Sequence, residues 1–355
     1  MYSPKFSITN KILKYIGRIE AARDYIENAP LVPAYEAKFR QEAIIRTVHH
    51  GTHIEGNPLD TGEVAAVLEG QTIDAKDRDV QEILNSREVL KYIDKRKTTN
   101  DQRLKLSEKE LLKIHQLTVN RVLSSDKAGK FRTTQVVVKN SKTGEVSFRP
   151  PSPVQVRDLI LDFVAWLNSD PASEIHPVLL AGVVHYVLAY IHPFVDGNGR
   201  VARSFATLVL FNKGYDIKKF FSLEEYFDRD GQRYYATLQS VSNQKVDNLS
   251  DRDLTIWLEY FCEGLAAELE RVREKVKKLS LDSRLKGRTG QIVLSERQVK
   301  LVEYIENNGS ISNRAWRSLL ADFSDDTILR DLKDLQKKKL IKKKGSTKGA
   351  VYVLK

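Results

Sequence analysis

The chain has 355 residues, a formal net charge of +11 and 41% hydrophobic residues, enough for two or three globular domains with ordinary cores. No apolar run reaches the roughly 18 residues of a membrane span, and the N-terminus lacks a signal-peptide-like apolar stretch, so we expect a cytoplasmic protein without membrane contact. Cys262 is the only cysteine, which excludes an intrachain disulfide, and no cysteine–histidine cluster has zinc-site spacing.

Residues 1–110 read as an N-terminal helical region, because apolar residues recur there at the spacing of one helix face. An amphipathic stretch, Phe39–His50, ends at Gly51, and Gly56-Asn57-Pro58 is a strong helix stop. Glu55 therefore lies near a helix end, where a carboxylate is ordinarily a surface group. The neighbouring histidines have no carboxylate at metal-site spacing and are expected in the core or on the surface: His49, His50 and His53.

Residues 111–279 read as a second, also helical, region that contains one hairpin. The β-branched stretch Gln135–Val138 and the stretch Val146–Phe148 flank a turn at Lys142-Thr143-Gly144. Strand-forming residues on both sides of a turn predict a β-hairpin, which we place within residues 131–148.

The most informative stretch is a loop between two apolar helical runs, Val178–Ile191 and Val201–Phe211. Glycines on both sides of an asparagine let the backbone approach a ligand closely, and the following helix presents unpaired N–H groups and the positive end of its dipole. A histidine suits a general base, a carboxylate suits Mg²⁺, and two arginines suit phosphate oxygens. The residues are His192, Asp196, Gly197, Asn198, Gly199, Arg200 and Arg203. Together they favour phosphoryl or nucleotidyl transfer over an ordinary helix–loop–helix turn.

The string from His192 to Arg203 resembles the signature of the Fic family, His-Pro-Phe-x-Asp/Glu-Gly-Asn-Gly-Arg-x-x-Arg, at every specified position. The resemblance implies a mainly α fold, namely a Fic-type helical bundle with a hairpin flap, and transfer of AMP from ATP to a protein hydroxyl. It implies that His192 deprotonates a Ser, Thr or Tyr hydroxyl, that Asp196 binds Mg²⁺, and that Asn198 with the loop amides holds the α-phosphate. Arg200 and Arg203 would contact the β- and γ-phosphates.

Other parts of the chain also resemble the Fic family. The kinase-like relatives have a lysine where Gly199 stands, so AMP transfer is favoured, while UMP or GMP transfer stays open. The hairpin at 131–148 would dock the target segment as an added strand. Tyr234 and Tyr235 resemble the segment that follows the active site in Fic proteins, and they either line the base pocket for ATP or pack in the core. His185 is expected in the core rather than as a second base.

Many Fic proteins carry an N-terminal inhibitory motif, Ser/Thr-x-x-x-Glu-Gly/Asn, and Ile54-Glu55-Gly56-Asn57 is similar to it. Gly51 stands where the motif has Ser or Thr. The resemblance implies that Glu55 pairs with Arg203 and withdraws it from the γ-phosphate, so that ATP binds unproductively.

Residues 280–294 read as a linker, and residues 295–355 as a separate unit with 14 Lys and Arg against 8 Asp and Glu. Three amphipathic helices and two short strands, Leu340-Ile341 and Val351–Leu354, resemble the winged helix-turn-helix fold. In that fold the third helix enters the major groove and the wing meets phosphates. The candidate DNA-binding residues are Thr327, Arg330, Lys333, Lys343, Lys344 and Lys348. Such units also serve as protein-docking or dimer surfaces, so DNA binding and a homodimer are both left open.

The sequence predicts two possible functions. The first is an Mg²⁺- and ATP-dependent protein adenylyltransferase, which modifies a target protein or itself and is inhibited by Glu55. The alternative is a nucleotide-sensing, DNA-binding transcriptional regulator.

Overall fold

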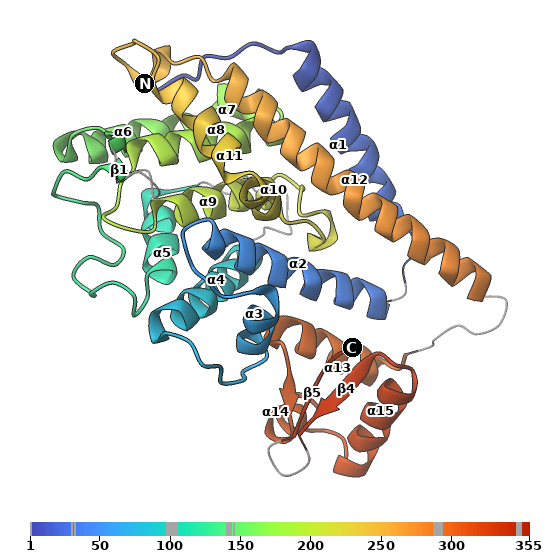
Figure 1. Ribbon diagram of the computed structural model, residues 1–355. Helices are drawn as coiled ribbons and strands as arrows, with labels where there is room; N and C mark the ends of the chain where they lie inside the picture. The colour runs from blue at the N-terminus through green and yellow to red at the C-terminus, as the bar shows by residue number, and fades with distance from the viewer. Residues whose placement is uncertain are drawn as a thin grey trace.

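The computed structural model describes residues 2–29, 31, 33–96, 106–139, 144, 146–286, 294–345 and 350–355. Figure 1 shows a mainly helical body with a smaller C-terminal unit at one end, so the predicted mainly α fold is confirmed. Across these residues, no helix combines the length and the apolar character that crossing a bilayer requires.

Two antiparallel helices form the centre of the body, α8 (Pro177–Ile191) and α9 (Asn198–Asn212). Helix α8 is buried almost all round, as its nearly continuous apolar sequence requires. The helix α12 (Thr255–Lys286) crosses α8 at Gly182, where a Cβ would lie 2.7 Å from the Leu258 side chain. The Trp257 indole N–H donates to the Gly182 carbonyl at 2.8 Å. Glycine therefore permits the close crossing of the two helices.

Helix α1 (Asn10–Asn28) lies beside α12 and runs in the same direction (Figure 1). Thr9 caps α1 and also donates to Glu259, and Arg18 pairs with Glu270 further along. Since α12 continues to Lys286, it extends into the range 280–294 that was expected to be a linker. The charged sequence after residue 269 is amphipathic, and its apolar positions Val272 and Val276 are buried.

The N-terminal region contains α2 (Pro33–His53), α3 (Thr61–Leu68) and α4 (Asp77–Lys95), and α5 (Glu108–Thr118) crosses its expected end at residue 110. Helices α2, α4 and α5 contact the loop between α8 and α9 or the first turns of α9. A small apolar cluster joins α2, α3 and α4: Val48, Leu59, Val64, Val67, Leu68 and Ile83. The segment after α2, which carries Glu55, is therefore held between α2 and α4.

The predicted hairpin is present but shorter than expected, because β1 (Val138–Lys139) pairs with β2 (Val146–Phe148) in an irregular antiparallel register. Residues 135–137 are not strand, and most of the predicted turn lies outside the described residues. The remaining helices of the body are α6 (Pro153–Leu167), α7 (Asp170–Glu174), η1 (Ile217–Lys219), α10 (Leu223–Arg229), α11 (Gly231–Ser242) and η2 (Leu249–Asp251).

The C-terminal unit contains the three helices and two strands predicted there, and one further strand. Its elements are α13 (Glu296–Asn308), β3 (Ile311–Ser312), α14 (Asn313–Leu319), α15 (Asp325–Lys337), β4 (Ile341–Lys344) and β5 (Val351–Leu354). The sheet is antiparallel in the order β3-β5-β4. Ser312 belongs to β3, and its side chain also caps α14 by accepting from the Ala315 N–H.

The C-terminal unit packs on α2 and α3. Ala37 of α2 is part of its apolar core, and Ser310 donates to the Glu69 carbonyl at 3.2 Å. At Gly309 the backbone has φ +80°, and a Cβ there would lie 2.2 Å from the Leu68 carbonyl oxygen. The backbone at Gly309 is therefore in direct contact with the backbone at Leu68, and only glycine fits at position 309.

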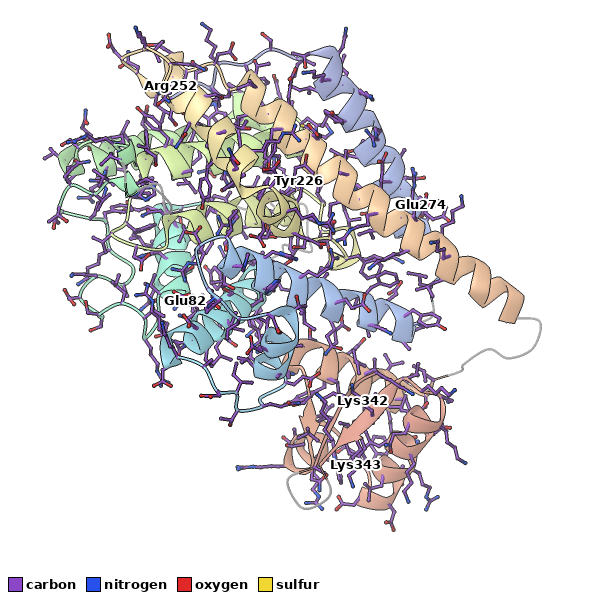
Figure 2. The ribbon with its side chains drawn as sticks, in the orientation of Figure 1. Glu82, Tyr226, Arg252, Glu274, Lys342 and Lys343 are labelled. Carbon is purple, nitrogen blue, oxygen red and sulfur yellow. The ribbon has the colours of Figure 1, made fainter. Side chains whose placement is uncertain are left out.

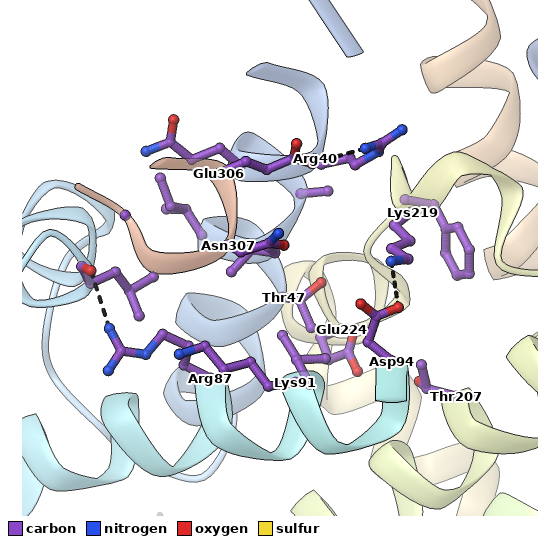
Figure 3. Close-up of a pocket in the computed structure, with 18 of the residues that line it drawn as sticks. Arg40, Thr47, Arg87, Lys91, Asp94, Thr207, Lys219, Glu224, Glu306 and Asn307 are labelled. Carbon is purple, nitrogen blue, oxygen red and sulfur yellow. Dashed lines mark hydrogen bonds and ion pairs between the residues drawn. The ribbon is translucent and has the colours of Figure 1, made fainter. Parts of the chain in front are cut away.

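A cavity of about 330 Å³ lies between α2, α4 and α13, and Figure 3 shows its lining. Ion pairs close it on two sides, Arg40 with Glu306 and Lys219 with Asp94. Burial raises the pKa of Glu306 to about 7, against the opposing effect of Arg40. The Arg40–Glu306 pair joins the two units, whereas the Lys219–Asp94 pair lies within the body.

We expect Gly309→Ala to weaken the docking of the C-terminal unit by about 1–3 kcal/mol, because the added methyl group meets the Leu68 carbonyl. Hydrogen–deuterium exchange should become faster in α13 and in the first turns of α2. The matched control is Gly70→Ala, since Gly70 has the same φ of +80° but nothing within 4 Å of the added Cβ. Equal exchange in the two variants would show that the contact does not hold the unit in place.

Candidate active site

The loop begins at His192, which ends α8 in the left-handed conformation with φ 51° and ψ 58°. A residue other than glycine in this region is uncommon, and such strain is concentrated at functional sites. The His192 Nδ1 atom lies 3.2 Å from the Ala189 carbonyl oxygen, which can only accept, so Nδ1 carries the proton. Nε2 of the neutral ring is then unprotonated. Burial lowers the pKa of His192, so the ring can accept a proton at neutral pH.

Arg132 fixes the backbone at the start of the loop. Its Nε donates to the His192 carbonyl at 2.8 Å, and its backbone N–H donates to the Pro193 carbonyl at 2.9 Å. Nη1 donates to Thr134, just before the hairpin. This buried arginine therefore joins the hairpin to the catalytic loop, a role that its sequence position alone did not reveal.

The middle of the loop is held by the Asn198 side chain and by the packing of Phe194. Asn198 accepts from the Phe194 N–H and donates to the Phe194 carbonyl, both at 2.8 Å. Phe194 is fully buried and stacks on the His115 ring with 3.7 Å between centroids. His115 accepts from the Gly129 N–H and faces the Asp196 carbonyl at 3.2 Å. Burial lowers the pKa of His115 to about 4, so this second histidine is a neutral support of the loop.

The two arginines of the loop are both paired with carboxylates of the N-terminal region. Arg203 Nη2 lies 2.7 Å from Glu55 Oε1 and 3.0 Å from the Gly51 carbonyl oxygen. Burial alone would raise the pKa of Glu55, but the Arg203 guanidinium outweighs burial and holds it below its ordinary value. Arg200 Nη1 lies 3.2 Å from Glu82 Oε1. The sequence suggested the first pair through the resemblance and gave no sign of the second.

Asp196 is the partly exposed carboxylate of the loop. One oxygen accepts from the Gly197 N–H at 2.6 Å, and the other lies 3.2 Å from Arg78 of α4. Asp196 and the buried Arg200 face the N-terminus of α9, and Arg200 Nε and Nη1 have no hydrogen-bond acceptor among the described residues. A carboxylate, a guanidinium and a helix N-terminus fit the phosphates of a nucleotide with Mg²⁺, an ion that proteins hold by one or two carboxylates.

The two tyrosines that were expected either to line the base pocket for ATP or to pack in the core, Tyr234 and Tyr235, lie in different environments. Tyr234 is buried and hydrogen bonds His185 at 3.1 Å, so both residues lie in the core. Burial lowers the pKa of His185 to about 3, which keeps it neutral. Tyr235 is 40% exposed and donates to the Ile54 carbonyl at 3.3 Å. Tyr235 thus contacts the segment that carries Glu55.

The histidines at the end of α2 are not free. His50 and His53 each face the Asp228 carboxylate, at 2.7 and 2.9 Å, and His49 packs against both rings. These contacts attach the end of α2 to α10.

The residues expected to contact DNA are only partly available. Arg330, Lys333 and Lys343 are exposed, and Figure 2 shows Lys343 on the C-terminal unit, at the far end of the molecule from α12. The Thr327 hydroxyl bonds Ser324 at the start of α15. Lys344 pairs with Glu69 of the body, and Lys348 lies outside the described residues.

Residues 105–210 match the family model described as "Fic/DOC family". Two curated relatives, from Drosophila grimshawi and Culex quinquefasciatus, are both named protein adenylyltransferase Fic. The first is 33% identical over 199 residues, which cover 56% of this chain and 39% of the relative, and the second is 33% identical over 204 residues, which cover 57% and 39%. The match therefore spans about two fifths of the length of these relatives.

Two solved structures show the same fold. A Fic family protein from Desulfovibrio desulfuricans is 22% identical with a TM-score of 0.64, over 100% of this chain and 98% of that one. Fic-1 from C. elegans is 26% identical with a TM-score of 0.59, over 77% and 73%.

We expect Asn198→Ala to destabilise the loop by about 2–3 kcal/mol, because the Phe194 N–H and carbonyl each lose a buried partner. Exchange of the Phe194 amide should become faster, as measured by hydrogen–deuterium exchange. Asn28→Ala is the control, since the Asn28 side chain makes its hydrogen bonds at the exposed end of α1. Unchanged protection at Phe194 would mean that packing alone holds the loop.

Proposed function

We propose that this chain, whose residues 105–210 form a Fic/DOC family domain, transfers AMP from ATP to a Ser, Thr or Tyr hydroxyl of a protein or of itself. The observation that supports this most directly is the loop itself. An imidazole with an unprotonated Nε2, the N-terminus of α9 and two buried arginines lie within one turn and its flanks. The curated relatives named protein adenylyltransferase Fic support the same reaction.

In this reaction the substrate hydroxyl oxygen attacks the α-phosphorus of ATP and pyrophosphate leaves. His192 Nε2 takes the hydroxyl proton, and the Nδ1–H bond to Ala189 keeps the ring in the tautomer that can do so. The loop amides and α9 stabilise the charge on the α-phosphate. The Asn198 side chain shapes the loop through its two hydrogen bonds with Phe194, and the second N–H of its amide would serve the α-phosphate. Asp196 would hold Mg²⁺, which when bound neutralises charge on the phosphates.

The Glu55–Arg203 pair explains how this activity would be restrained. Arg203 is almost fully buried, and its Nη2 is shared between the Glu55 carboxylate and the Gly51 carbonyl. A γ-phosphate could use this guanidinium only by displacing Glu55. We infer that nucleotide binds while the pair persists but lies in an unproductive position.

We infer that a protein substrate docks on the hairpin. The short β1–β2 pair is connected to the catalytic loop through Arg132 and contacts α8 through the Phe148 and Tyr190 rings, 5.4 Å apart. A segment added along its edge would reach the loop near His192. Backbone pairing gives a register and does not select a sequence.

A second function, DNA binding by the C-terminal unit, is favoured by one observation. Arg330, Lys333 and Lys337 recur on the exposed side of α15, the third helix of the unit, which in a winged helix-turn-helix domain enters the major groove. This function is compatible with the first, and a cytoplasmic enzyme could carry both.

We expect Glu55→Gly to gain the mass of one AMP or more when incubated with Mg²⁺ and ATP, read as intact mass, while the wild type gains little. Glu55→Gln should also be active, because it removes the charge that holds Arg203. Glu55→Gly combined with His192→Ala should gain nothing while still binding ATP. If no variant is modified, alone or with cell lysate, and DNA binding changes with ATP, the regulator function is favoured instead.

The pH dependence of AMP transfer should report His192. Its pKa is lowered by burial, and only the neutral ring accepts the proton, so activity is present above that pKa and is lost as pH falls through it. We therefore expect the acid limb of the Glu55→Gly rate profile to lie below pH about 6.5, the ordinary histidine pKa. Circular dichroism across the same range serves as a control for unfolding. An acid limb above the ordinary value would contradict the assignment of His192 as base.

A further inference from the structure

Glu82 is a buried carboxylate that lies behind the catalytic loop. It belongs to α4 (Figure 2), and only 7% of the residue is exposed. Its Oε1 lies 3.2 Å from Arg200 and 3.4 Å from Arg78, and its Oε2 accepts from Asn57 at 3.2 Å. A buried carboxylate is stable only with such partners, so this site is built around its charge.

The contact with Arg200 has a particular geometry. Arg200 Nη1 is within ion-pair distance of Glu82, yet neither Nη1 nor Nε has an aligned hydrogen-bond acceptor among the described residues. Glu82 therefore compensates the charge of the buried guanidinium from the side of α4. Nε and Nη1 are buried, whereas Nη2 lies on the loop side, 3.7 Å from Asp196 Oδ1. Arg200 projects from the first turn of α9, where an anion is favoured.

The other oxygen of Glu82 connects to the inhibitory segment. Asn57 follows Glu55 by two residues and is buried, and its amide also donates to the Asp79 carbonyl at 3.1 Å. The Asn57 Oδ1 atom accepts from the Leu59 N–H, which closes a tight turn. One carboxylate thus supports both the arginine of the loop and the turn that presents Glu55.

We propose that Glu82 is a positioning residue for nucleotide binding: it holds the Arg200 guanidinium toward the β-phosphate. This proposal rests on the proposed function. Glu82 touches neither nucleotide nor substrate, so its effect reaches the phosphates only through Arg200. The contribution of Glu82 should therefore appear only with nucleotides that have a β-phosphate.

The test compares ADP with AMP by isothermal titration calorimetry in the Glu55→Gly background with Mg²⁺. Adding Glu82→Gln, which keeps the shape and an acceptor for Asn57, should lower the ratio of ADP affinity to AMP affinity about tenfold, the scale of one charge-assisted hydrogen bond. AMP affinity should change little. Arg200→Ala should lower the ratio similarly, and the double variant should be no worse than Arg200→Ala, because the two residues act as one unit.

Two further variants control for folding. Glu88→Gln, on the exposed side of the same helix, should leave the ratio unchanged. Glu82→Asp keeps the charge but shortens the side chain. Its ratio of ADP affinity to AMP affinity should therefore lie between the ratios measured with glutamate and with glutamine at position 82. This variant provides a second measurement if Glu82→Gln does not fold. Thermal unfolding of each variant identifies those that are folded.

An unchanged ratio in the folded Glu82 variants, or an equal loss of ADP and AMP affinity, would overturn the proposal and leave the proposed function standing. If the Glu55→Gly protein itself binds neither ADP nor AMP, the proposed function fails instead. The two failures are therefore distinguishable.

Discussion

The Arg203 guanidinium lies almost fully inside the protein, where an uncompensated charge would cost several kcal/mol. The structure meets this constraint by bringing a carboxylate from another element to the arginine. The same arrangement recurs around the loop: Glu82 from α4 lies next to Arg200, and Glu225 and Glu268 both lie 2.6 Å from Arg46 of α2. Buried ion pairs thus add to the apolar core in holding the N-terminal helices against the body, and the pairs with Glu55 and Glu82 orient the loop arginines.

Helix α2 connects these features. Its first turns fill part of the C-terminal core through Ala37, its middle is held by Arg46, and its end is attached to Asp228 by His50 and His53. The chain leaves this end directly into the segment of Glu55. Because one continuous helix joins these contacts, the position of Glu55 depends on elements far from the loop. A carboxylate placed on a mobile segment would pair with Arg203 less often, since its ordering entropy would oppose the contact.

Sequence reasoning reached the local features and missed those made between distant segments. The helix–loop–helix around Asn198 was predicted correctly, because it depends on local sequence: apolar helical runs at 178–191 and 201–211, and the glycines on both sides of Asn198. The pairing of Glu55 with Arg203 came from the family resemblance. Glu82, Arg78, His115 and Arg132 were missed because they lie some 60 to 120 residues from the loop groups they contact. Lys344, expected to face DNA phosphates, instead pairs with Glu69, a partner that only the docking of the two units creates.

The parallel contact of α1 with α12 has a consequence for how the chain is made. Arg18 and Glu270 are 252 positions apart. At about 5–20 residues per second, a ribosome needs roughly 13–50 s to synthesise the chain between them. During that time the face of α1 that packs on α12 is not yet fully covered, and an isolated helix of this length is barely stable in water. Ile12, Ile19 and Ile26 then remain exposed in the nascent chain, so the first helix to be translated is among the last to reach its final place.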